Sequence, residues 1–94
     1  MRGPAVLDFD FIEWDDEDNP GGNVRHIADN GLNRDEVEDV LYGLGSRRVR
    51  SRSSNRPAMI GETATGKTVI VVYERHNDSG RVVIRPVTSY EIEP

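Results

Sequence analysis

The sequence predicts a single α+β domain over residues 1–94: an N-terminal strand, two short helices, then an antiparallel meander of about four strands. Apolar residues recur at helical spacing before residue 45, whereas a period of two begins at Ser46. A chain of 94 residues can bury one modest core. We therefore expect one compact domain, with residues 1–4 flexible.

The first predicted strand runs from Ala5 to Trp14, where aromatic and apolar side chains are interleaved with acids. The segment from Asp15 to Gly22 ends it. This segment combines consecutive acids, which repel one another, with the turn sequence Asn-Pro-Gly-Gly.

Two short helices follow the turn. The first is predicted over Asn23 to Asn30, with Gly31 at the position where a helix often ends in a left-handed residue. The second begins at Asn33, which can cap it, and Glu36 can return the hydrogen bond to complete a capping box. It is expected to stop near Tyr42.

The second half of the chain is predicted to form strands separated by turns. The predicted strands are Ser46 to Arg52, Pro57 to Glu62, Lys67 to Arg75, and Arg81 to Val87. The predicted turns are residues 53–55, 63–66 and 76–80, which are rich in Ser, Asn, Asp and Gly.

The stretch G-E-T-A-T-G-K-T, from Gly61 to Thr68, has the spelling of a phosphate-binding P-loop. A P-loop requires a helix after its lysine, because the helix N-terminus holds the phosphates. Here V-I-V-V-Y follows at once, and such residues favour a strand. We therefore interpret the stretch as a hairpin, with Gly66 supplying a positive φ, and expect no nucleotide there.

The composition of the chain excludes several classes of protein and of binding site. There is no cysteine, so neither a disulfide framework nor a thiolate metal site is available. No apolar run approaches the roughly 20 residues of a membrane span, and the N-terminal region turns acidic too early for a signal peptide. We expect a soluble cytoplasmic protein without membrane contact or cofactor. The acids near the N-terminus lack calcium-loop spacing, so no metal site is predicted.

The net charge of −5 conceals two regions of opposite sign. Seven of the 17 acids lie between Asp8 and Asp18, and five of the 12 bases lie between Arg47 and Arg56. The residues predicted to contact phosphate are Arg48, Arg50, Arg52, Arg56, Lys67 and Arg85. For the four arginines from Arg48 to Arg56, the alternative is an edge strand kept soluble by charge, or a patch that pairs with the acidic start of the chain.

Several strings in this order resemble the BrnT family of small ribonuclease toxins from bacterial toxin–antitoxin systems. They are I-E-W-D (Ile12 to Asp15), N-V-R-H-I-A-D-N-G-L-N-R-D-E-V-E-D-V-L (Asn23 to Leu41), G-K before V-I-V-V-Y-E (Gly66 to Glu74) and I-R-P-V-T-S (Ile84 to Ser89). The resemblance implies a RelE-like toxin fold, metal-independent cleavage of RNA, and a small antitoxin partner of ribbon-helix-helix type.

The chain departs from the family at two positions. Asn30 stands where such toxins usually carry a His, and Tyr90 stands where they usually carry an Arg in the last strand. Two functions are therefore open: a ribonuclease toxin, or an inactive relative that binds protein or RNA.

Metal-free RNA cleavage needs a proton acceptor, a proton donor and cations near the phosphate. His26, on the first predicted helix, is the best candidate for proton transfer. His76 falls in a predicted turn and is expected to be solvated. Tyr90 is the second catalytic candidate, since it can stack on a base or donate to a phosphate.

Overall fold

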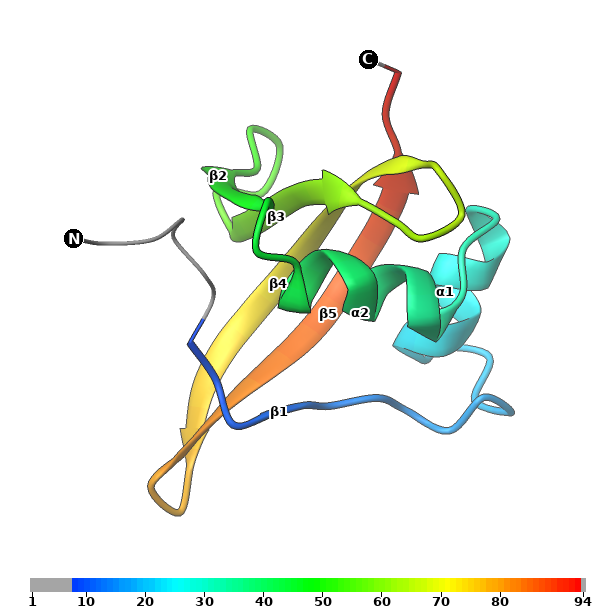
Figure 1. Ribbon diagram of the computed structural model, residues 1–94. Coiled ribbons are helices and arrows are strands. Elements are labelled where there is room, and N and C mark those ends of the chain that lie inside the picture. The colour runs from blue at the N-terminus through cyan, green and yellow to red at the C-terminus, as the bar shows by residue number, and fades with distance from the viewer. Residues whose placement is uncertain (1–7, 94) are drawn as a thin grey trace, which may run out of the picture.

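The computed structural model describes residues 8–93 and has two helices and a five-stranded mixed sheet (Figure 1). In chain order the elements are β1 (Phe11–Ile12), α1 (Asn23–Asp29), α2 (Arg34–Tyr42), β2 (Arg47–Arg50), β3 (Pro57–Glu62), β4 (Thr68–Asp78) and β5 (Arg81–Glu91). The predicted α+β class and the order of the elements are confirmed. No helix within residues 8–93 is long and apolar enough to cross a membrane.

The sheet has the strand order β1-β5-β4-β3-β2. Strands β2 to β5 form an antiparallel meander, and β1 joins β5 in parallel through Phe11 and Ile12. The first strand is therefore shorter than predicted, since only Phe11 and Ile12 pair with β5. The chain then continues toward the turn at residues 15–22. The part of the prediction before Asp8 and the flexibility of residues 1–4 lie outside the described residues.

The hairpin of β4 and β5 is longer than predicted at both ends. The predicted turn from His76 is wrong, because pairing continues through Asp78 and the turn is Ser79 and Gly80 alone. These two residues have φ of 52° and 82°, and two left-handed residues make a turn whose twist matches that of the strands. β5 also passes Val87, where a bulge shifts the register and pairing resumes at Thr88.

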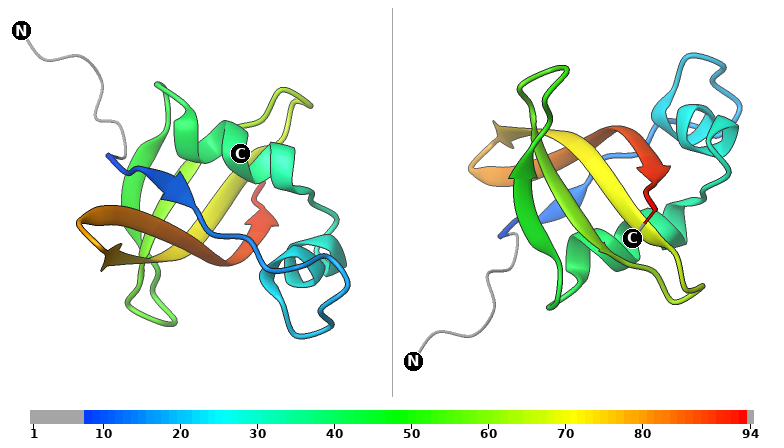
Figure 2. Two further views of the ribbon diagram at one scale, coloured as in Figure 1. Left: turned by 90° about the horizontal axis from the view of Figure 1, so that it is seen from below. Right: turned by 90° about the horizontal axis from the view of Figure 1, so that it is seen from above.

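α2 covers one face of the sheet, and Figure 2 shows it lying across the strands. Buried residues of α2 and the loop before it form the core with inward residues of the sheet and Ile27 of α1. They are Ile27, Leu32, Val37, Val40, Leu41, Met59, Val69, Val71, Tyr73 and Ile84. This burial is the main source of stability in so small a domain.

The opposite face of the sheet, here called the open face, carries the alternate residues of the same strands. By register its central members are Val49, Ala58, Ile60, Ile70, Val72, Thr88 and Tyr90. No helix of residues 8–93 lies over this face in either view of Figure 2. Ala58 and Val72 are buried on this face, whereas Val49, Ile60, Ile70 and Thr88 are half-buried and Tyr90 is exposed. An antiparallel sheet can leave such a face partly in contact with solvent or a ligand.

α1 shields the edge of β5 beyond its short pairing with β1. The Asn23 side chain donates to the carbonyls of Glu13 (3.1 Å) and Pro86 (3.0 Å), and the Asn30 side chain donates to the Ser89 carbonyl (2.9 Å). The Pro86 and Ser89 carbonyls lie on β5, and these amides satisfy them in place of a neighbouring strand. α1 is thereby fixed beside the open face.

The stretch from Gly61 to Thr68, which has the spelling of a P-loop, forms a hairpin, as predicted. β3 ends at Glu62, Gly66 has φ of 86°, and β4 begins at Thr68, one residue later than expected. Gly61 is required by packing, because a Cβ atom there would overlap the Ser46 hydroxyl. That serine is itself buried and donates to the Val40 carbonyl at 2.7 Å.

The predicted capping box at the start of α2 is confirmed. The Glu36 amide donates to Asn33 Oδ1 at 2.9 Å, and the Asn33 amide donates to Glu36 Oε1 at 3.2 Å. Replacing Asn33 by alanine is expected to lower the free energy of unfolding by about 1 kcal/mol. Urea unfolding followed by circular dichroism measures this change. Asn77→Ala, at an exposed position of β4, is the control, and equal losses in both variants would contradict the role of the cap.

Candidate functional site

A cavity of about 280 Å³, here called the histidine cavity, lies at the border between α1 and the sheet. Its lining residues are Gly21, Gly22, Asn23, His26, Arg56, Glu74, Arg85, Pro86 and Val87. Three of the residues predicted from the sequence, His26, Arg56 and Arg85, thus meet around one hollow. They come from α1, the loop before β3, and β5.

Neighbouring elements set the direction of these side chains. His26 precedes the buried Ile27, so its own side chain is exposed at the surface of α1. Glu74 and Arg85 are opposite each other in the β4–β5 ladder and continue the open face past Val72. The cavity therefore combines an imidazole, a carboxylate and two guanidinium groups.

Arg85 is held by acids from the N-terminal segment. Its Nη1 donates to Asp15 Oδ1 at 2.9 Å and its Nη2 to Asp15 Oδ2 at 2.7 Å, with Glu13 at 3.6 Å. The hydrogen bond from Arg85, followed by that from the Asn23 amide, lowers the pKa of Asp15. The same bond raises the pKa of Arg85. Arg85 is therefore positioned firmly, with much of its charge already compensated.

Arg56 is held far more loosely. Its Nε lies 3.5 Å from Glu74 Oε2, and the two side chains are 42% and 49% exposed. Such exposed pairs contribute about 0–1 kcal/mol, so an anion can displace the carboxylate at little cost. Sequence reasoning missed Glu74, although an acid directly after V-I-V-V-Y, four residues from Ile70 on the same strand face, was the available signal.

A second hollow of about 420 Å³, here called the tyrosine cavity, lies over the open face near β2. Its lining residues are Val49, Arg50, Ser51, Arg52, Ser53, Ile60, Ile70 and Tyr90. Tyr90 lines this cavity and His26 lines the other, so the two predicted catalytic residues do not share a cavity.

The two positions that depart from the BrnT pattern are close together. Asn30 ends α1 and donates to the Ser89 carbonyl, directly before Tyr90. The Ser89 hydroxyl is buried and donates to the Ile70 carbonyl at 3.0 Å. Asn30 thus has a structural role in this chain, which is to join α1 to β5.

The arginines predicted to contact phosphate between Arg48 and Arg56 do not all lie on one strand face. β2 ends at Arg50, because the chain turns where the Ser51 amide donates to the Arg56 carbonyl at 2.8 Å. Arg52 therefore lies in the loop. Arg48 and Arg50 share a face as predicted, and Arg48 is opposite the core residue Met59, on the side of the sheet where α2 packs against β3 and β4. Both side chains are nevertheless exposed, and Arg50 also lines the tyrosine cavity.

One observation agrees with this placement of the β2 arginines. Burial raises the pKa of Tyr73, a core residue, and the positive charges of Arg48, Arg75 and Arg50 oppose that rise. The Arg50 Nη1 also donates to the Asn55 carbonyl at 2.8 Å, which ties it to the loop.

Lys67 lies outside both cavities. Its Nζ is 3.0 Å from Glu36 Oε2 and 3.2 Å from the Gly31 carbonyl oxygen. The Thr65 hydroxyl donates to the same carboxylate at 2.6 Å and, with Lys67 and the Asn33 amide, lowers the pKa of Glu36. Lys67 therefore fastens the β3–β4 hairpin to the start of α2.

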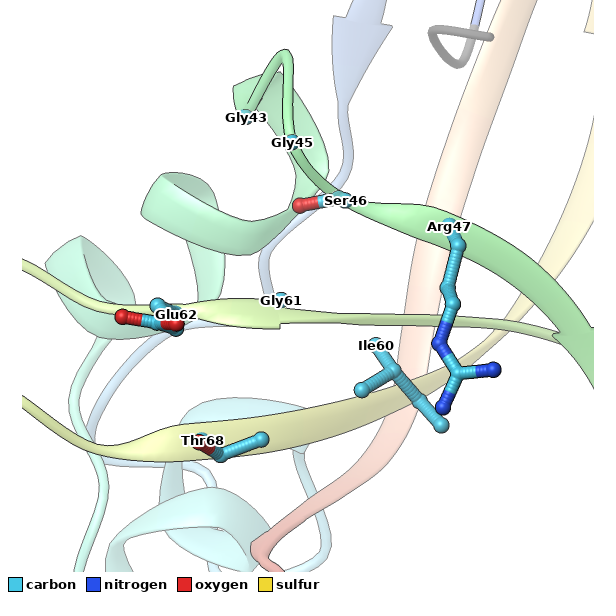
Figure 3. Close-up of a pocket in the computed structure, with 8 residues that line it drawn as sticks. All are labelled: Gly43, Gly45, Ser46, Arg47, Ile60, Gly61, Glu62 and Thr68. Carbon is cyan, nitrogen blue, oxygen red and sulfur yellow. The ribbon is translucent and has the colours of Figure 1, made fainter. Parts of the chain in front are cut away.

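A third hollow, of about 380 Å³, lies at the end of the open face near the loop after α2 (Figure 3). Its lining residues are Gly43, Gly45, Ser46, Arg47, Ile60, Gly61, Glu62 and Thr68. Figure 3 shows the side chains of Arg47 and Ile60 projecting to the same side from paired strands. Ile60 lines both this hollow and the tyrosine cavity, so the two hollows adjoin there, whereas Arg47 lines only the third hollow.

Among residues 8–93, no group of three or more His, Asp or Glu side chains could hold a metal ion. No protein-family model, no curated protein and no solved structure matches this chain.

Proposed function

We propose that this chain is the toxin-like component of a bacterial type II toxin–antitoxin pair and cleaves RNA without a metal ion, as its resemblance to the BrnT family implies. The observation that supports the proposal best is the histidine cavity. It combines His26 and Glu74, two groups able to transfer protons, with Arg56 and Arg85. This is the set of groups that metal-free cleavage of a phosphodiester needs.

The proposed reaction divides these roles. The Glu74 carboxylate takes the proton of the 2′-hydroxyl, whose oxygen attacks the neighbouring phosphorus. The bond from phosphorus to the 5′-oxygen breaks, and protonated His26 gives a proton to the departing oxygen. The products are a 2′,3′-cyclic phosphate and a 5′-hydroxyl end.

Arg56 stabilises the charge that builds on the phosphate. Its exposed ion pair with Glu74 is weak, so a phosphate can take the guanidinium while the carboxylate is freed to act as the base. Arg85 acts mainly through position: its double hydrogen bond to Asp15 fixes one wall of the cavity.

Incubation of purified protein with RNA in the presence of a chelator, between about pH 5 and 8, tests the proposal. We expect cleavage to persist without divalent metal and to leave 2′,3′-cyclic phosphate ends, which end-labelling identifies. The absence of cleavage across this range, with or without divalent metal, would remove the enzymatic part.

The alternative is that the fold binds RNA or a protein without cleaving RNA. Three observations favour it: Arg85 is already compensated by Asp15, and the family's His and Arg are replaced by Asn30 and Tyr90. RNA binding that weakens with salt, without product formation, would support this alternative. Growth arrest on expression, relieved by a small ribbon-helix-helix protein encoded beside it, would count against it.

A further inference from the structure

The tyrosine cavity combines an apolar floor with an exposed aromatic ring. Val49, Ile60 and Ile70 are half-buried on the open face, and Tyr90, paired with Ile70 across β4 and β5, is 44% exposed. An exposed aromatic residue over aliphatic side chains presents a surface that a flat, partly apolar ring can cover.

Two arginines lie along the β2 side of this surface. Arg52, in the loop after β2, lines the cavity, and within residues 8–93 its side chain makes no hydrogen bond or ion pair. Arg47, at the start of β2, extends beside Ile60 in the adjoining hollow, and Ile60 lines both hollows (Figure 3). A ligand with an aromatic ring and anionic groups on either side of it fits this arrangement, and one nucleotide within an RNA chain has that chemistry.

We propose that the tyrosine cavity binds an unpaired nucleobase of single-stranded RNA, with Tyr90 stacked on the base and Arg47 and Arg52 beside the flanking phosphates. The proposal rests on the proposed function and extends it by naming the class of substrate. A base inside a duplex is stacked between its neighbours and cannot present its face to a tyrosine. Single-stranded RNA is therefore the preferred ligand.

The positions of the histidine cavity and the tyrosine cavity fit an RNA strand that passes both. Tyr90 and Arg85 lie on the open side of β5, five residues apart, which corresponds to roughly 17 Å along a strand. RNA held at Tyr90 can therefore extend along the open face toward His26. In this arrangement Tyr90 selects the substrate and takes no part in proton transfer.

Fluorescence anisotropy with a short 2′-O-methyl RNA, which cannot be cleaved by attack of its own 2′-hydroxyl, measures binding separately from activity. The full chain is titrated with the single strand, with the same sequence as a duplex, and with a single strand that contains abasic sites. The variants are Tyr90→Ala and Tyr90→Phe. The control is Tyr42→Ala, which changes a 61% exposed tyrosine on α2.

We expect Tyr90→Ala to weaken single-strand binding about 5- to 150-fold, the range for loss of one stacked base, and Tyr90→Phe to retain most of the affinity. Tyr42→Ala is expected to bind as the unchanged protein does. The duplex and the abasic strand are expected to bind more weakly and to be insensitive to Tyr90. Thermal unfolding monitored by circular dichroism verifies that each variant is folded.

Equal binding of single strand and duplex, or no effect of Tyr90→Ala in a folded variant, would overturn the inference while leaving RNA binding intact. An acidic protein partner that covers Tyr90 without changing RNA affinity would overturn it as well. Failure of the unchanged protein to bind any RNA would instead refute the proposed function on which the inference rests.

Discussion

Replacing His26 by alanine is expected to slow RNA cleavage by about 10²- to 10⁴-fold, the usual contribution of a positioned acid or base. The free energy of unfolding is expected to change little, because this side chain is exposed and makes no hydrogen bond within residues 8–93. Initial cleavage rates on a defined RNA, compared at equal concentrations of folded protein, measure the effect.

The chain provides a matched control in its other histidine. His76 is exposed on β4, where it pairs with Val83 of β5. It lines neither the histidine cavity nor the tyrosine cavity. His76→Ala should therefore leave the rate unchanged. If both variants lose activity equally, or neither does, His26 does not supply the proton in this reaction.

Local sequence signals predicted the elements well because the deciding interactions are local. The Asn33 cap and the Ser79-Gly80 turn each involve residues close in sequence, although the turn was shorter than its polar composition suggested. The β1–β5 pairing joins Phe11 to Val83 across most of the chain. No local pattern could specify that partner, so the sheet's first edge was not predictable.

The candidate site was predictable only in part, for the same reason. The alternation of β2 correctly placed Arg48 and Arg50 on one side of the strand. Which side this is depends on pairing with Met59 and on the packing of α2. Likewise Arg85 was predicted to contact phosphate, but its partner is Asp15, 70 positions away, which no local pattern could indicate. A list of basic residues therefore overstates how many cations are available to RNA.

Asp15 is expected to matter more for stability than any other member of the acidic N-terminal segment. It accepts two hydrogen bonds from Arg85 and one, at 2.9 Å, from the Asn23 amide at the start of α1. Asp15→Ala is expected to lower the free energy of unfolding by about 2 kcal/mol, a value reduced for the partial exposure of both side chains. Urea unfolding at neutral pH measures it, with Asp18→Ala as an exposed control.

The same contacts predict a dependence on pH. The pKa of Asp15 lies below its ordinary value of 3.8 in the folded protein, so its stabilisation is complete above that value and is lost as the pH falls through the lowered pKa. The difference in stability between the unchanged protein and Asp15→Ala should therefore be largest near neutral pH and shrink under acidic conditions. A difference that stays constant down to about pH 2 would show that the loss comes from packing rather than from the ionised carboxylate holding Arg85 and α1 together.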